Sequence, residues 1–158
     1  MKIRRAFAED AKGIQSVECQ AFQACYSAYL PDAYLKSLPS NQEEIEKIRR
    51  TLLTHEAWVA EENKRIVGFS WIEPLEKEVF ELVTIYIHPD FQKQGIGTAL
   101  MEHVCQQKKK EGYQKVVLWT IKDGPSLGFY HKKGCVFSSV PEKLWRFDIP
   151  LVRLEKKL

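Results

Sequence analysis

Apolar residues recur at helical spacing near the start of the chain, after a short run typical of a strand. Residues Lys2–Arg5 are predicted to form that strand. The acidic pair Glu9-Asp10 then precedes Ile14, Val17 and Phe22, which lie one or two helical turns apart. A strand followed by an amphipathic helix is therefore expected first.

Two further helices are predicted before the long strands. Pro31 interrupts an aromatic-rich segment, and proline ends one helix but can open another. Ser40-Asn41 can cap a helix with Ile45 and Ile48 on its apolar side, and Glu43-Glu44 would then lie near the positive end of its dipole.

Strand-like runs dominate the middle and the end of the sequence. Residues 58–60 and 65–72 are typical of a hairpin, and a long strand is predicted at Val79–Ile87 because His88-Pro89 cannot continue a central ladder. The later elements are predicted as a helix at Ile96–Lys110, a strand at Lys115–Ile121, a short helix at 127–130 and closing strands at Val136–Phe137 and 145–154.

Composition indicates one globular domain over residues 1–158. Hydrophobic residues make up 44% and charged residues 28%, which are ordinary values for a chain that builds its own core. Lys and Arg exceed Asp and Glu by 24 − 21 = 3, too few to favour nucleic acid without a basic stripe. The nearest candidates, Lys108–Lys110 and Lys156-Lys157, are predicted to be solvated ends.

Cysteines and hydrophobic runs exclude several classes of protein. Cys19, Cys25, Cys105 and Cys135 form no CxxC pair and have no His at zinc-ligand spacing, so reduced thiols and no metal site are predicted. There is no signal-like N-terminus and no apolar run near membrane-span length. A soluble cytoplasmic protein without a membrane partner is expected.

The stretch 92–100, with sequence QKQGIGTAL, lies where the predicted strand gives way to the helix. Glycine allows close approach of the backbone, and the first N–H groups of a helix favour an anion. A phosphate-binding loop is therefore predicted. A GxxxxGK nucleotide loop is excluded because Leu100 occupies the sixth position from Gly95, and the dinucleotide GxGxx(G/A) pattern fails at the same residue.

The remaining pattern is Q/R-x-x-G-x-G/A, and here the sequence resembles the GCN5-related N-acetyltransferase (GNAT) family. Gln92 to Gly97 follow a strand ending in His-Pro, as in that family's coenzyme A loop. The segment 123–134, DGPSLGFYHKKG, is similar to the family's N-x-x-A-x-x-F-Y-x-x-x-G element. The resemblance is specific from about Val79 to Phe137.

The resemblance implies a mixed α/β fold with a mostly antiparallel, twisted sheet of about six to seven strands. Four to five helices would flank the sheet, which would be splayed between strands 4 and 5. It also implies acetyl-CoA as acyl donor, an amine as acceptor, and a homodimer as one arrangement through the last strands. Main-chain groups of residues 85–87 would hold the pantetheine arm and residues 93–98 the pyrophosphate. The implied cofactor-binding residues are Ile85, Tyr86, Ile87, Gln92, Lys93, Gln94, Gly95, Ile96, Gly97, Thr98, Asp123, Ser126, Phe129 and Tyr130.

Tyr130 matches the tyrosine that the family places beside the thioester sulfur, as acid or hydrogen-bond donor to the leaving thiolate; a tyrosine packed in the core is the alternative. Proton transfer from a phenol to a thiolate is uphill by about 2 kcal/mol, so a hydrogen bond suffices. Glu81 matches a position used as general base, although direct transfer from an ammonium to a carboxylate costs about 8 kcal/mol and favours a water relay. A surface glutamate is the alternative. His88 is expected to be structural.

Two departures from the family pattern bear on function. Asp123 replaces the usual asparagine, and Cys135 replaces the usual phenylalanine, with Phe137 as a substitute in a shifted strand. The leading hypothesis is an N-acetyltransferase for a primary amine. The second hypothesis is an acyl-CoA-binding sensor or interaction module with little catalysis. The third is an NAD-binding enzyme, but Leu100 stands where the dinucleotide pattern requires a small residue. Residues 22–38 and 73–78 are candidates to line the acceptor site.

Overall fold

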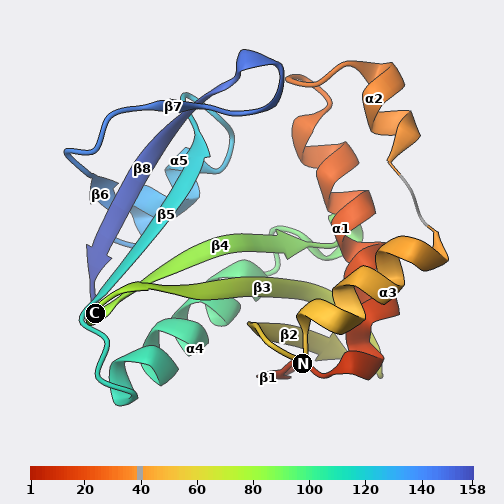
Figure 1. Ribbon diagram of the computed structural model, residues 1–158, viewed down its shortest axis with the longest axis horizontal. Coiled ribbons are helices and arrows are strands. Elements are labelled where there is room, and N and C mark those ends of the chain that lie inside the picture. The colour runs from red at the N-terminus through yellow and green to blue at the C-terminus, as the bar shows by residue number, and fades with distance from the viewer. Residues whose placement is uncertain (39–40) are drawn as a thin grey trace. The chain divides into compact units, whose positions relative to one another are not determined.

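The computed structural model describes residues 1–38 and 41–158, which divide into two compact units. The first unit comprises Met1–Ile72 and Thr84–Val104, and the second comprises Glu73–Val83 and Cys105–Leu158. Each is described by itself (Figure 1). The single domain predicted over residues 1–158 stays a prediction.

The first unit follows the predicted order of elements. Pro31 precedes α2, and Asn41 caps α3 by accepting the Glu44 N–H at 2.9 Å; the other predicted cap residue, Ser40, lies outside the described residues. Its elements are β1 (Lys2–Arg5), η1 (Ala8–Asp10), α1 (Ala11–Tyr26), α2 (Asp32–Ser37), α3 (Gln42–Thr51), β2 (Glu56–Glu62) and η2 (Pro89–Phe91), with most of β3 (Arg65–Glu76), the end of β4 (Val79–Ile87) and the start of α4 (Ile96–Lys110).

Helices cover both faces of the sheet in this unit. Ile14 and Val17 of α1 and Ile48 of α3 pack with Val59 and Phe69 in one buried cluster. Ile96, the first residue of α4, packs on a different cluster of strand residues that includes Val67. Full burial of such side chains stabilises the fold by about 1.5–3 kcal/mol each, and it fixes the start of α4 against the sheet.

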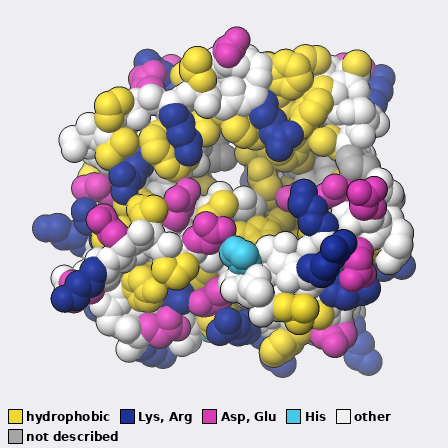
Figure 2. Space-filling view, in the orientation of Figure 1, with side chains coloured by type: hydrophobic (Ala, Val, Ile, Leu, Met, Phe, Trp, Pro, Cys, Tyr) yellow, Lys and Arg dark blue, Asp and Glu magenta, His cyan; other side chains and the backbone are white. Residues whose placement is uncertain are grey.

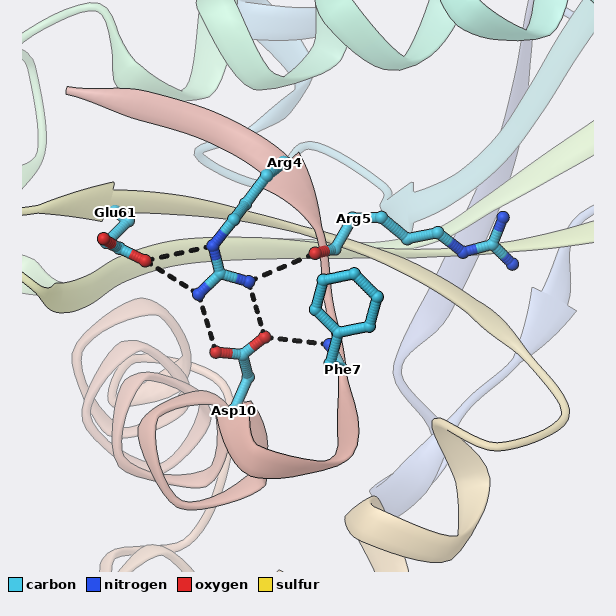
Figure 3. A network of polar contacts seen from close by, with 5 residues as sticks. All are labelled: Arg4, Arg5, Phe7, Asp10 and Glu61. Atoms are coloured by element: carbon cyan, nitrogen blue, oxygen red, sulfur yellow. Dashed lines mark hydrogen bonds and ion pairs between the residues drawn. The ribbon is translucent and has the colours of Figure 1, made fainter.

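Arg4 joins three elements of the first unit through its guanidinium group (Figure 3). Its Nη1 and Nη2 donate to the two carboxylate oxygens of Asp10 at 2.7 and 2.8 Å, and its Nε and Nη2 donate to Glu61 at 3.0 and 2.7 Å. Nη1 also donates to the Arg5 carbonyl, and the Phe7 N–H donates to Asp10. Bidentate Arg–carboxylate pairs are stronger than single hydrogen bonds, and this one links β1 to β2 and to the N-terminus of α1.

Loss of this network is expected to destabilise the protein without touching the candidate site. Burial by itself raises the pKa of Asp10, but hydrogen bonds from Arg4 and Phe7 outweigh it and hold the pKa below its usual value. Because the folded carboxyl has the lower pKa, its stabilising effect is complete above the unfolded pKa of about 4 and is lost as the pH falls through the folded value. We expect Asp10→Asn to lower the free energy of unfolding by about 2 kcal/mol at pH 7 and by less at pH 3.

Urea unfolding at the two pH values measures this difference. Asp32→Asn is the matched control, because the ion pair of Asp32 with Lys36 has side chains that are 78% and 76% exposed, and exposed pairs contribute little. Equal losses in the two variants at pH 7 would contradict the role given to Asp10.

The second unit is built on the central strand β5 (Lys115–Ile121). β5 pairs in parallel with Val79–Glu81 of β4 and antiparallel with β8 (Pro150–Lys157). Val116, Val117 and Leu118 are almost completely buried, as a strand covered on both faces requires. The remaining elements are α5 (Leu127–Lys132), β6 (Val136–Phe137), β7 (Lys143–Leu144) and η3 (Arg146–Asp148).

The predicted fold class is confirmed, with a sheet order of β1-β2-β3-β4-β5-β8-β6 and with β7 paired to β8. The short parallel ladder of β4 and β5 agrees with the expected splay between these strands. The predicted strand at 145–154 is wrong at its start, because Phe147 and Asp148 adopt left-handed φ angles of 53° and 58° and the strand begins only at Pro150. β7 was not predicted from the sequence, and two-residue strands leave little pattern.

The prediction that Lys108 is part of a solvated end is wrong. Lys108 is only 5% exposed; its Nζ lies 2.7 Å from Glu111 and 5.2 Å from the ring centre of Tyr113. Lys108 therefore packs against the residues that follow α4 and is not exposed to solvent. Lys and Arg are interspersed with Asp and Glu on the face shown in Figure 2. No helix among the described residues is long and apolar enough to cross a membrane.

Candidate active site

The end of β4 is anchored to β3 where the sheet changes register. The pairing of β2 with β3 shifts between Ala60 and Glu61, and the register passes over Val67. The Val67 carbonyl accepts the N–H of His88, the residue after β4, at 2.9 Å. A bulge redirects the groups of its strand, and here the carbonyl of the residue that the register passes over holds the residue after β4.

His88 supports the loop and confirms the structural interpretation made from the sequence. The side chain is 3% exposed, and its Nε2 lies 2.8 Å from the Arg65 guanidinium. Because a guanidinium only donates, Nε2 accepts that hydrogen bond and is not available to take a proton from a substrate. Arg65 also lies over the Phe91 ring, 5.5 Å from its centre, so one cation holds both ends of η2.

The predicted phosphate loop has the backbone of an anion-binding turn. Lys93 and Gly95 adopt left-handed φ angles of 60° and 83°, and alternation of this kind turns successive N–H groups toward one side. The Gln92 side chain donates to the Ile87 carbonyl and that of Gln94 to the Asp90 carbonyl, both at 3.1 Å. The loop is thus held by its own polar side chains.

The helix that follows begins directly after Gly95, so its first N–H groups come next in the chain. The earliest bond of α4 to the preceding turn runs from the Ala99 N–H to the Gly95 carbonyl at 2.9 Å. The N–H groups of Ile96, Gly97 and Thr98 precede that bond and have no helical acceptor by geometry. Ile96 is 4% exposed, so burial of its side chain fixes the direction of these donors.

Tyr130 lies in the second unit, on α5. It is 8% exposed, with the Phe129 ring edge-on at 5.2 Å between ring centres. The Tyr130 carbonyl accepts N–H groups of Lys133 and Cys135, each at 3.0 Å, and its own N–H donates to Ser126 at 3.2 Å. Both ends of this short helix are therefore hydrogen-bonded to Tyr130. Ser126 is the N-cap residue before α5, but its side chain makes no capping hydrogen bond.

The backbone conformation at position 123 explains why Asp123 can stand where the family usually has asparagine. Its φ angle is 57°, a left-handed conformation in which Asn and Asp are both favoured over other side chains. Gly124 follows in a tight turn, where an added Cβ would lie 2.8 Å from Ile121. Asp can thus replace Asn without change in the backbone after β5.

The prediction that Phe137 takes the place of the family's phenylalanine in a shifted strand is wrong. Cys135 is 1% exposed and fills the buried position itself, whereas Phe137 is 58% exposed. Phe137 instead lies edge-on to His131, with ring centres 5.1 Å apart. Val136–Phe137 pair with Leu154 and Glu155 of β8, and the Phe137 side chain is not carried inward by this pairing.

The predicted site residues are thus found in two groups. The first unit holds Ile85, Tyr86, Ile87, Gln92, Lys93, Gln94, Gly95, Ile96, Gly97 and Thr98, and the second holds Glu81, Asp123, Ser126, Phe129 and Tyr130. Glu81 lies on β4 opposite Val117 of β5 and is half-buried. No three His, Cys, Asp or Glu side chains are grouped as metal ligands among the residues described.

Comparison with protein families decides the class. The model of the acetyltransferase (GNAT) family matches residues 19–135. The chain belongs to the GNAT acetyltransferase family. Acetyl-CoA is the donor substrate of this family, and membership makes the protein an acetyl-CoA-dependent N-acetyltransferase.

Individual GNAT proteins support the assignment along the chain. The uncharacterized N-acetyltransferase YuaI of Bacillus subtilis is 30% identical over 161 residues, covering 98% of this chain and 88% of its own. The uncharacterized N-acetyltransferase MJ1207 of Methanocaldococcus jannaschii is 38% identical over 84 residues, covering 49% of this chain and 37% of its own. The PaiA N-acetyltransferase of Thermoplasma acidophilum, solved in complex with coenzyme A, has a TM-score of 0.79 at 19% identity and full coverage of both chains, which shows the shared fold.

Some residues around the GNAT loop could not be found from the sequence. Arg65 begins a strand and carries no local signal, yet it holds His88 and Phe91. Cys25 and Tyr26 lie on α1, far from the loop in sequence, and they contact Gln92 and Tyr86. Only the fold reveals these contacts.

Proposed function

We propose that this GNAT protein transfers the acetyl group of acetyl-CoA to a primary amine by direct attack. The neutral amine nitrogen forms a bond to the thioester carbonyl carbon, and the carbon–sulfur bond breaks. The coenzyme A thiolate takes up a proton, and the nitrogen releases one. The products are an N-acetylated amine and free coenzyme A.

The proposed acetyl-CoA site rests on one observation. Lys93 and Gly95 adopt left-handed φ angles directly before the first turn of α4. The N–H groups of residues 93–98 would hold the pyrophosphate, since backbone donors and the helix dipole both favour an anion there. Main-chain groups of Ile85, Tyr86 and Ile87 would pair with the pantetheine arm. Gln92 supports this arrangement by its bond to the Ile87 carbonyl.

Tyr130 is proposed to act on the leaving group. Its hydroxyl would donate a hydrogen bond to the thiolate as the carbon–sulfur bond breaks, which stabilises charge that develops only in the transition state. Burial of the ring and its contact with Phe129 would fix the direction of the hydroxyl. Asp123, Ser126 and Phe129 are proposed to line the cofactor near this helix.

Glu81 is proposed as the general base for the attacking amine, acting through a water molecule. A relay avoids the large cost of direct transfer from an ammonium to a carboxylate. Glu81 is half-buried on β4, opposite Val117 of β5. The N–H of Ile87 is proposed to stabilise the developing oxyanion.

The second candidate function is an acyl-CoA-binding module with little catalysis. Asp123 in place of the family asparagine is the observation in its favour, but the left-handed φ of this residue explains the change by backbone preference alone. Release of free thiol with amines and peptides separates the two, because robust turnover on any of them excludes the module.

Isothermal titration with acetyl-CoA tests the donor site first. We expect a dissociation constant between about 1 μM and 1 mM, as is usual for enzyme substrates, and no binding of a nicotinamide dinucleotide under the same conditions. Absence of heat at millimolar acetyl-CoA would remove the proposed function.

A further inference from the structure

One face of α1 is directed at the strand proposed to hold the pantetheine arm. Phe22, Cys25 and Tyr26 are three or four residues apart, so they share one side of the helix. Phe22 and Tyr26 each lie edge-on to Tyr86 of β4, with ring centres 6.3 Å apart. Phe69 approaches Tyr86 in the same way at 5.9 Å. The end of α1 and the end of β4 thus share an aromatic cluster.

A hydrogen bond within this cluster joins the two elements. The hydroxyl oxygens of Tyr26 and Tyr86 are 3.0 Å apart. Burial raises the pKa of both phenols, so each stays protonated at neutral pH and the bond is one between neutral hydroxyls. A half-buried pair of this kind is costly to break on one side only, because the remaining hydroxyl loses its partner.

A second contact joins the same helix to the start of the loop. The Gln92 side chain lies beside the Cys25 thiol and lowers its pKa, against the larger raising effect of burial. Its Nε2 donates to the Ile87 carbonyl at 3.1 Å. Residues 25 and 26 therefore contact both segments proposed to bind the donor. A helix that contacts strand and loop together can fix their mutual geometry.

Resting on the proposed function, we infer that Tyr26 is a positioning residue for acetyl-CoA, acting through the hydroxyl of Tyr86. Tyr26 holds the side chain of Tyr86, and Tyr86 lies between Ile85 and Ile87, whose main-chain groups would bind the pantetheine arm. Loss of the pair lets the end of β4 adopt other conformations, and the fraction of protein ready to bind the donor falls. The acetyl-transfer step itself uses neither hydroxyl.

The variants Tyr26→Phe, Tyr86→Phe and the double variant test this inference, with Tyr113→Phe as the control, because Tyr113 is half-buried and lies outside both proposed binding segments. Acetyl-CoA affinity is measured by titration, KM and kcat by thiol release, and folding by thermal unfolding. We expect each single variant to weaken binding and raise KM about fivefold, with kcat within about twofold and no further loss in the double variant.

Single variants that bind as well as the wild type, or as the Tyr113→Phe control, would overturn the inference and leave the proposed function intact. Losses that add in the double variant would overturn it too, since the two hydroxyls would then act separately. A wild-type protein that fails to bind acetyl-CoA would remove the proposed function and the inference with it.

Discussion

Replacing Tyr130 by phenylalanine is expected to lower kcat about a hundredfold while the dissociation constant of acetyl-CoA changes by less than about threefold. The substitution removes one hydroxyl and keeps the ring that packs against Phe129. A hydrogen bond to a leaving thiolate is made in the transition state and not with the bound thioester, so its loss appears in kcat. Steady-state thiol release and acetyl-CoA titration measure the two quantities.

Tyr113→Phe is the matched control for this experiment. Tyr113 is half-buried in the same unit, with the Phe80 ring edge-on at 5.6 Å, and we give it no part in the reaction. Its variant should keep the wild-type rate. If Tyr130→Phe also retains the wild-type kcat, another group must stabilise the thiolate and the role given to Tyr130 is wrong.

Replacing Gly95 by alanine is expected to weaken acetyl-CoA binding at least about tenfold. Gly95 adopts a φ of 83°, where a side chain costs about 1–2 kcal/mol. An added Cβ would meet no protein atom within 4 Å, so crowding inside the protein is not the reason for glycine. The Cβ would instead point into open space beside the loop, where the proposed pyrophosphate is held by backbone N–H groups.

Gly112→Ala separates the loss of cofactor from the loss of stability. Gly112 follows the other end of α4, has a φ of 96°, and likewise has no atom within 4 Å of an added Cβ. The two variants should lose similar free energy of unfolding, and only Gly95→Ala should bind acetyl-CoA poorly. Equal affinities in the two variants would show that the loop does not approach the cofactor.

Strong local patterns made much of the fold predictable. The bounds of β4 follow from a nine-residue run rich in strand-forming residues and ended by His88-Pro89, and the start of α4 follows from the change to helical spacing at Ile96. The loop between them follows from the same change of pattern, and its role as an anion site stays a prediction.

Other features depend on contacts between distant residues and could not be predicted. Trp145 to Ile149 have strand-like composition, yet the left-handed φ angles of Phe147 and Asp148 break the strand. Lys108 carries a charge that predicts solvent exposure, but Tyr113 and Glu111 enclose it. Cys135 occupies the buried position after α5, and Phe137, two residues further on, is exposed.

The same distinction applies to the candidate site. The residues of the loop are adjacent in sequence, so a short motif identified them. Arg65 bonds to His88 across 23 positions and Tyr26 to Tyr86 across 60, and no spacing rule connects such pairs. The groups that position the loop are therefore visible only in the fold, whereas the groups proposed to bind the cofactor are visible in the sequence.

Detection of the N-acetylated product tests the central claim most directly. Purified protein is incubated with acetyl-CoA and a panel of small amines and peptides, and product is identified by mass spectrometry while free coenzyme A is measured in parallel. We predict an N-acetylated primary amine formed in equal amount to free coenzyme A, with formation strongly reduced in Tyr130→Phe. Tight binding of acetyl-CoA with no acetylated product from any amine or peptide would contradict the proposed transfer and favour the acyl-CoA-binding module.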